Sequence, residues 1–127
     1  MRALYATALS MALCFQVQGA PHPCIGKGAI NGIFDGFTRG GTFALQGDEQ
    51  RYVLAGVFLS EPDKLAKLSG EVVLQPIDGG LDRYRRQRVN LFQGEHWIQA
   101  EAVLAGRALV FGSSGSAACS SLLNNLE

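Results

Sequence analysis

The densest group of chemically active side chains is a run of four arginines around one tyrosine, Arg83-Tyr84-Arg85-Arg86-Gln87-Arg88. Guanidinium groups bind phosphate through paired hydrogen bonds, and a tyrosine ring stacks on a nucleic-acid base. The run therefore predicts a nucleic-acid-binding site at Arg83, Tyr84, Arg85 and Arg88. The alternative is a solvated turn and strand edge, in which Asp78 and Asp82 neutralise part of the charge.

The other reactive residue types form no familiar catalytic or metal-binding pattern. His22 and His96 are not spaced as ligands with Cys24 or Glu95, and a zinc site needs about four ligands. The chain has no glycine-rich phosphate loop between a strand and a helix, and no Ser-His-Asp set. Spacing alone therefore predicts no metal site.

Two cysteines are expected to form a disulfide after export. The first 19 residues have the layout of a secretory signal peptide, with Arg2 before an apolar run from Ala3 to Phe15 and a cleavage site after Gly19. A membrane anchor is the alternative, but the run is shorter than the roughly 20 apolar residues that span a bilayer. Cys24 and Cys119 remain in the mature chain, and an oxidising compartment favours their pairing over two free thiols.

Length and charge limit the remaining possibilities. The chain has 127 residues, which allows one domain, expected over residues 25–127. Loss of Arg2 leaves ten basic and eleven acidic residues, a net charge of −1. This balance predicts no general attraction to nucleic acid or to an anionic membrane, so polyanion binding requires a local patch. We expect a secreted or periplasmic protein without stable membrane insertion after signal cleavage.

Apolar runs separated by turn residues predict a mainly β fold with helices. The expected strands are 29–34, 42–45, 51–59, 71–76, 87–92 and 108–111, with turns at Asp35-Gly36 and at Asp78-Gly79-Gly80. Ser60 to Gly70 and Trp97 to Ala105 have helical spacing and end at glycines. Ser116 is expected to cap a last helix that turns Cys119, Leu122, Leu123 and Leu126 inward. This order fits a five-stranded barrel of the oligonucleotide/oligosaccharide-binding (OB) type with helical additions.

The order of short motifs resembles the staphylococcal-nuclease-like, or thermonuclease, family over nearly the whole mature chain. Each motif alone is weakly specific, but the ordered set is more specific than any single motif. The matching segments are Gly40-Gly41-Thr42-Phe43, Val53-Leu54-Ala55-Gly56-Val57-Phe58-Leu59-Ser60-Glu61, Leu68-Ser69-Gly70-Glu71-Val72-Val73-Leu74, Asp82-Arg83-Tyr84-Arg85-Arg86, Trp97-Ile98-Gln99 and Gly106-Arg107-Ala108-Leu109-Val110.

The resemblance implies calcium-dependent hydrolysis of phosphodiesters in DNA or RNA. In such enzymes acidic side chains hold the ion, a glutamate activates water and two arginines bind the phosphate. The glutamate matches Glu61 and the second arginine matches Arg86. The first arginine position is Val53, and Arg51 lies two residues away on the same face of the expected strand.

The family's metal ligands are replaced by residues that cannot bind calcium. The first metal aspartate falls on Gly41, or on Phe37 in another register, and the second falls on Phe58. Loss of one transition-state donor already costs on the order of 10²–10³ in rate. We therefore expect an inactive member that needs no cofactor, although calcium would be required if the family activity survived.

Two classes of function follow from the sequence. The first is a binding module for single-stranded nucleic acid, an oligosaccharide or a protein partner on the barrel face. The second is a weak or altered phosphodiesterase that uses Glu61, Arg86 and Arg51.

Overall fold

The computed structural model describes residues 22–38, 41–60 and 68–127, and this part of the chain is mainly β with two helices. The expected signal peptide, residues 1–19, lies outside the described residues. No helix in the described ranges is long and apolar enough to span a bilayer. The elements are β1 (Ile30–Phe37), β2 (Thr42–Leu45), β3 (Arg51–Leu54), β4 (Val57–Leu59), β5 (Gly70–Leu81), β6 (Arg86–Gln93), β7 (His96–Trp97), α1 (Ile98–Leu104), β8 (Ala108–Val110) and α2 (Ala117–Asn124).

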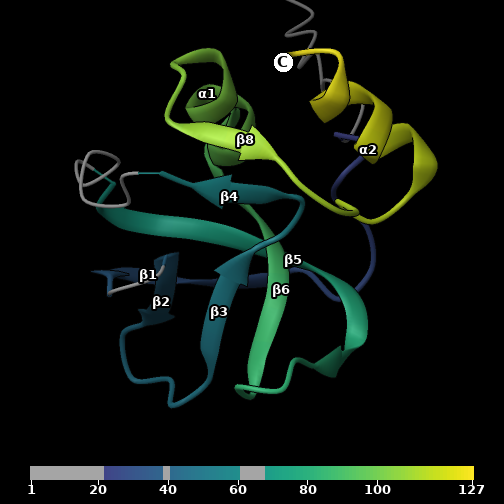
Figure 1. Cartoon of the computed structure of the whole chain (residues 1–127). Helices are drawn as coiled ribbons and strands as arrows, with labels where there is room; N and C mark the ends of the chain where they lie inside the picture. The colour runs from purple at the N-terminus through teal and green to yellow at the C-terminus, as the bar shows by residue number, and fades with distance from the viewer. Residues whose placement is uncertain (1–21, 39–40, 61–67) are drawn as a thin grey trace, which may run out of the picture.

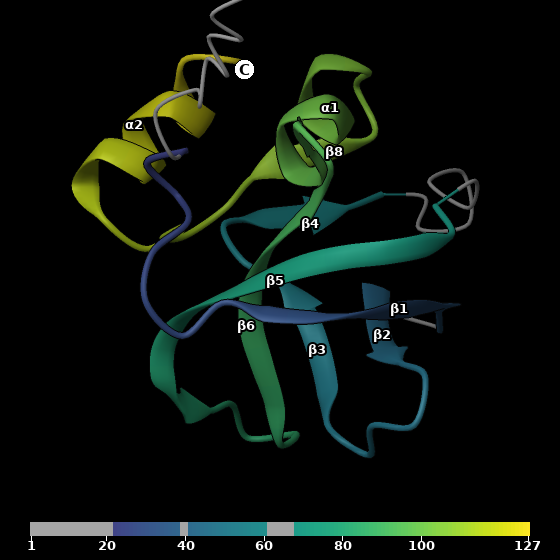
Figure 2. The ribbon, with the colours of Figure 1, turned by 180° about the vertical axis from the view of Figure 1, so that it is seen from behind.

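Five of the strands form a ring. Antiparallel pairs join β3 to β2, β2 to β1, β1 to β5 and β5 to β6. A parallel pair between β3 and β6 closes the ring, with Arg51 opposite Arg86 and Leu54 opposite Val89. In Figure 1, β1 and β5 cross behind β2, β3 and β6, and Figure 2 shows the same crossing from the other side. The ring therefore brings the start of β3 beside the arginine-rich start of β6.

A separate two-stranded sheet of β4 and β8 lies between the ring and α1 (Figure 1). The expected single strand 51–59 is wrong, because Ala55 and Gly56 form a turn that divides it into β3 and β4. Gly56 has a φ of 73°, in the left-handed region that favours glycine. This turn directs β4 away from the ring and towards β8.

The core consists of two clusters. One fills the ring and includes the fully buried Phe43, Leu74, Val89 and Leu91. The other lies between the helices and β6, and contains Phe92, Trp97, Leu123 and both cysteines. Cys24 and Cys119 form the expected disulfide, with their Cα atoms 5.2 Å apart. This bond ties the segment before β1 to α2, which lie together at one side of the molecule in Figure 2.

A buried amide links the two clusters. Gln99 accepts a hydrogen bond from the backbone N–H of Leu91 (3.0 Å) and donates to the carbonyl oxygens of Ala55 (3.2 Å) and Val89 (3.0 Å) and to Oδ1 of Asn90 (3.0 Å). Asn90 in turn donates to the carbonyl oxygen of Ser114 at 2.8 Å. Burying these groups is tolerable because they bond to one another.

Several local expectations are confirmed and others are wrong. Ser116 caps α2 and accepts from the N–H of Cys119 at 3.1 Å, as expected. Leu122, expected to face inward, is instead exposed. Both predicted turns, at 35–36 and 78–80, lie within strands β1 and β5, and the strand register shifts near each of them. The predicted helix from Ser60 to Gly70 falls mainly on residues 61–67, outside the described ranges.

Candidate functional site

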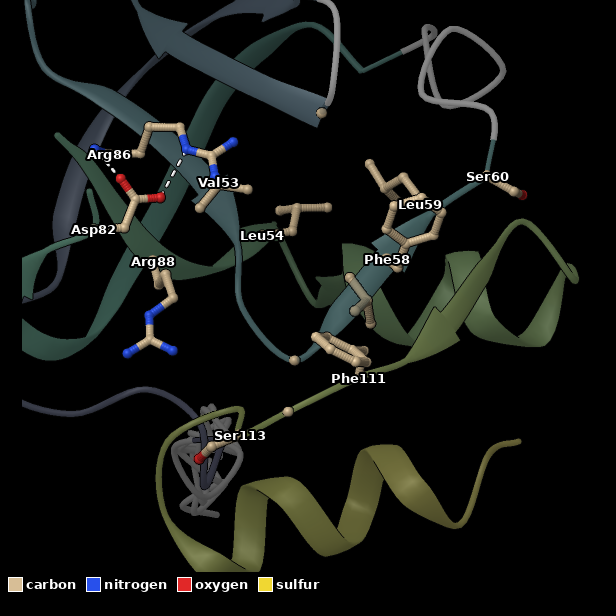
Figure 3. A pocket seen from close by; sticks show the side chains of 14 residues that line it. Val53, Leu54, Phe58, Leu59, Ser60, Asp82, Arg86, Arg88, Phe111 and Ser113 are labelled. Carbon is tan, nitrogen blue, oxygen red and sulfur yellow. Dashed lines mark hydrogen bonds and ion pairs between the residues drawn. The ribbon is translucent and has the colours of Figure 1, made fainter. Parts of the chain in front are cut away.

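A pocket of about 580 Å³ opens where the ring meets the two-stranded sheet. Figure 3 shows two walls of different character, with Arg86 and Asp82 on one side, Phe58 and Phe111 on the other and Leu54 between them. The polar wall comes from the start of β6 and the turn before it. The apolar wall comes from β4 and from the segment that follows β8.

Arg86 is held in place by its neighbours on the polar wall. Its Nε donates to Oδ2 of Asp82 at 2.8 Å, and its Nη1 donates to Oγ1 of Thr42 at 3.2 Å. Its Cζ lies 5.1 Å from the centre of the Tyr84 ring, within the range of a cation–π contact. The guanidinium is therefore fixed by contacts with β2 and with the turn at Asp82–Arg85.

Asp82 organises this turn. Its Oδ1 accepts the backbone N–H groups of Tyr84 (2.9 Å) and Arg86 (2.8 Å). Burial acts to raise the pKa of Asp82, but the hydrogen bonds from the Arg86 N–H and guanidinium and from the Tyr84 N–H outweigh it and bring the pKa below its usual value. Asp82 is therefore a charged partner of Arg86 and a poor general base at neutral pH.

Arg88 supplies a second cation on the same face of β6. Its Nη2 forms an ion pair with Oδ2 of Asp78, and about half of its side chain is exposed. Exposed ion pairs contribute at most about 1 kcal/mol. A phosphate could therefore replace Asp78 as the partner of Arg88 at small cost.

The apolar wall presents large side chains to solvent. Phe58 is 64 % exposed and Phe111 is 77 % exposed. Val53 and Leu54 of β3 line the pocket between these rings and the arginines. Exposed aromatic rings beside guanidinium groups are the arrangement on which bases stack while phosphates bind.

The resemblance described from the sequence assigns metal or phosphate ligands to several positions that line this pocket. Gly41, Val53 and Phe58 line it, whereas Phe37 packs against the rings of Phe34 and Phe43. Across residues 22–38, 41–60 and 68–127, no group of three or more His, Cys, Asp or Glu side chains could hold a metal ion. Glu61, the expected water-activating residue, lies outside these ranges.

The structure divides the other predicted site residues between two pockets. Arg86 and Arg88 line the pocket described above. Arg51, Tyr84 and Arg85 line a second one, on the other side of the Asp82–Arg85 turn. Arg51 thus lines the second pocket and not the one that Val53 lines. Arg83 is exposed on the turn itself and lines neither pocket.

Sequence reasoning missed the contribution of the segment after β8. Phe111, Gly112 and Ser113 line the first pocket, although 108–111 was expected only to form a short strand. The available signal was the alternation of Leu109 and Phe111 with Ala108 and Val110. When only one face of a strand is covered, every second side chain is exposed, even where all of them are apolar.

No protein-family model matches this sequence, and no curated protein matches it either. The two serine hydroxyl groups that line the pocket are engaged: Ser60 donates to the Arg107 carbonyl oxygen at 2.9 Å, and Ser113 donates to the Gly115 carbonyl oxygen at 3.2 Å. Among its described residues, the pocket can therefore bind an anion and stack a ring, but it presents no activated nucleophile.

Proposed function

We propose that this protein is an exported, non-catalytic binding module of the staphylococcal-nuclease-like type, and that its ligand is single-stranded nucleic acid. The observation that carries the proposal is the pairing, in one pocket, of Arg86 and Arg88 with the exposed rings of Phe58 and Phe111. Arginines along a backbone and aromatic rings under the bases are the usual components of such sites. The Cys24–Cys119 disulfide is compatible with an extracellular location.

The ring of five strands closed by the parallel β3–β6 pair supports an OB-type barrel as the scaffold. OB folds bind oligonucleotides and oligosaccharides on their strand faces and adjoining loops. Two guanidinium groups favour the first of these ligands, because they match phosphate and have no counterpart in a neutral sugar. An oligosaccharide or a protein partner remains the alternative occupant that a binding experiment can reveal.

The substitutions at the family's catalytic positions support binding without hydrolysis. A glycine, a valine and a phenylalanine, at 41, 53 and 58, stand where charged groups would be needed. Positioned charge is what stabilises a phosphoryl transition state. The alternative, a weak phosphodiesterase that uses Glu61 and Arg86, would have to assemble its ion site from residues beyond these positions.

The binding test uses the purified mature protein and a fluorescein-labelled oligothymidylate of about twelve nucleotides, within the roughly 4–16 that one OB fold covers. Fluorescence anisotropy is expected to show salt-sensitive binding that Arg88→Ala and Phe111→Ala each weaken about tenfold. Lys27→Ala removes an exposed charge away from the pocket and serves as the matched control. Equal affinities of the wild-type protein and its three variants for the oligonucleotide would contradict the proposal.

The catalytic alternative is tested on the same preparation. DNA and RNA are incubated with the protein in the presence of calcium or of a chelator, and the products are resolved by gel electrophoresis. We expect intact substrate in both cases. Chelator-sensitive cleavage that Glu61→Gln abolishes would replace the binding proposal with the enzymatic one.

A further inference from the structure

The second pocket has a volume of about 450 Å³ and lies between the β2–β3 and β5–β6 connections. Its lining residues are Glu49, Gln50, Arg51, Leu81, Tyr84 and Arg85. Arg51 and Arg85 contribute two positive charges and Glu49 contributes one negative charge, so the lining carries a net positive charge. Two apolar side chains accompany them, with Leu81 52 % exposed and Tyr84 65 % exposed. The pocket therefore offers both a stacking surface and anion-binding groups.

The two connections that form this pocket are bonded to each other. Nε2 of Gln50 donates to the carbonyl oxygens of Arg51 and of Arg85, at 2.9 Å in each case. Asp48 accepts the backbone N–H of Gln50 at 2.9 Å and the hydroxyl group of Tyr52 at 2.6 Å. These bonds fix the pocket before any ligand arrives, which lowers the ordering cost of binding.

Arg85 adopts an unusual backbone conformation. Its φ is 60°, and in the described part of the chain it is the only residue other than glycine with a positive φ. Side chains with a β-carbon rarely adopt this conformation, and such outliers are concentrated at functional sites. In this turn the conformation accompanies a guanidinium group that lines the second pocket.

The contact between Arg86 and Tyr84 connects the two pockets. Arg86 lines the first pocket and lies over the ring of Tyr84, and that ring lines the second pocket. A chain that leaves the first pocket over this contact enters the second directly. The order along this path is aromatic ring, arginine, aromatic ring, arginine, which is the alternation that successive bases and phosphates require.

We infer that the second pocket is a further nucleotide subsite, in which a base stacks on Tyr84 beside Leu81 while Arg51 and Arg85 bind the adjoining phosphate. This inference rests on the proposed function, since it extends the same single strand from one pocket into the next. The ligand is then a strand of several nucleotides, too long for the first pocket alone. The carboxylates of an acidic peptide would pair with the arginines, but they would provide no planar group to stack on the ring of Tyr84.

The test compares a short and a long labelled oligothymidylate, of about two and about eight nucleotides, by fluorescence anisotropy. The wild-type protein is expected to bind the long strand at least tenfold more tightly than the short one. Arg51→Ala and Leu81→Ser are each expected to weaken binding of the long strand about tenfold and to leave the short strand unchanged. Arg51→Ala is also expected to reduce the slope of log K against log salt by about 0.7.

Two controls make the outcomes separable. Arg51 and Leu81 line the second pocket and not the first, and their variants must keep the wild-type melting temperature within about 3 °C. Lys27→Ala is again the charge-matched control. If the wild-type protein binds neither strand, the proposed function fails together with this inference. A second outcome is that both oligonucleotides bind, that Arg88→Ala weakens binding of both, and that the second-pocket variants weaken binding of neither. In that case the proposed function stands and the second subsite is refuted.

Discussion

The side chain of Ser114 occupies the space that any side chain at position 56 would need. A β-carbon built on Gly56 would lie 2.0 Å from Oγ of Ser114 and 3.3 Å from Cδ2 of Leu123. The φ of 73° at Gly56 adds a conformational penalty for every other residue. Gly56→Ala is therefore expected to lower the free energy of unfolding by about 2–4 kcal/mol, measured by urea denaturation.

Two further variants separate the steric and conformational parts of this effect. Adding Ser114→Gly to Gly56→Ala removes the clash and should recover about half of the lost stability. Gly26→Ala is the control, because a β-carbon there meets nothing within 4 Å and the φ is not in the left-handed region. Equal losses at positions 26 and 56 would contradict the packing described above.

Gln99 is expected to be the most costly polar residue to replace. Its amide bonds to four backbone or side-chain groups that have no access to water. Gln99→Leu keeps a similar volume but removes these four hydrogen bonds. The Val89 carbonyl oxygen keeps the N–H of Ala55 as a partner at 2.8 Å, and each buried group that is left unpaired costs about 1–3 kcal/mol. We expect a loss of at least about 3 kcal/mol in urea unfolding, whereas Gln46→Leu, in the exposed turn after β2, should change stability by less than about 0.5 kcal/mol.

The disulfide should account for a large part of the stability of this chain. It joins residues 95 positions apart. Closure of such a long loop in the unfolded chain predicts a loss of about 4–5 kcal/mol on reduction. Cys24→Ala/Cys119→Ala should therefore unfold at a much lower urea concentration than the oxidised wild-type protein. Reductant should lower the urea midpoint of the wild-type protein to that of the variant and leave the midpoint of the variant unchanged. A wild-type midpoint that does not change with reductant would contradict this role.

Stability is expected to fall in acid partly through Asp82. Its pKa in the folded protein lies below the usual value of 3.8, so its contribution is complete above that pH and is lost as the pH falls through the folded pKa. Asp82→Asn should therefore show a shallower decline than the wild-type protein between about pH 5 and about pH 2. Urea unfolding at a series of pH values measures this, and parallel declines would show that Asp82 has no such role.

The sequence located the strand at 42–45 but misplaced other strand boundaries, both where a turn is apolar and where turn-like residues lie within a strand. The segment 42–45 is a strand as expected, because glycines precede it and polar turn residues follow it. The run from Arg51 to Leu59 gave no polar signal at Ala55-Gly56, so the turn there was not foreseen. Asp78-Gly79-Gly80 has the composition of a turn, yet it lies within β5, where the register between β5 and β6 shifts between Pro76 and Leu81.

The candidate site was predictable in composition but not in arrangement. The run Arg83–Arg88 indicated an anion-binding region, and the structure places its members on the two sides of one turn. That division depends on the parallel pairing of β3 with β6, which joins positions far apart in the chain. Phe58 and Phe111 lie on the same wall of the first pocket because β4 pairs with β8, and no local pattern could have paired them.

The position of the two cysteines also has a consequence for biosynthesis. Cys24 is synthesised 95 residues before its partner, so this bond cannot form until synthesis has reached α2. A chain that stops before α2 can never acquire this bond. Disulfide formation thus requires that synthesis has reached α2, and thiol labelling would distinguish chains that contain Cys119 from fragments that lack it.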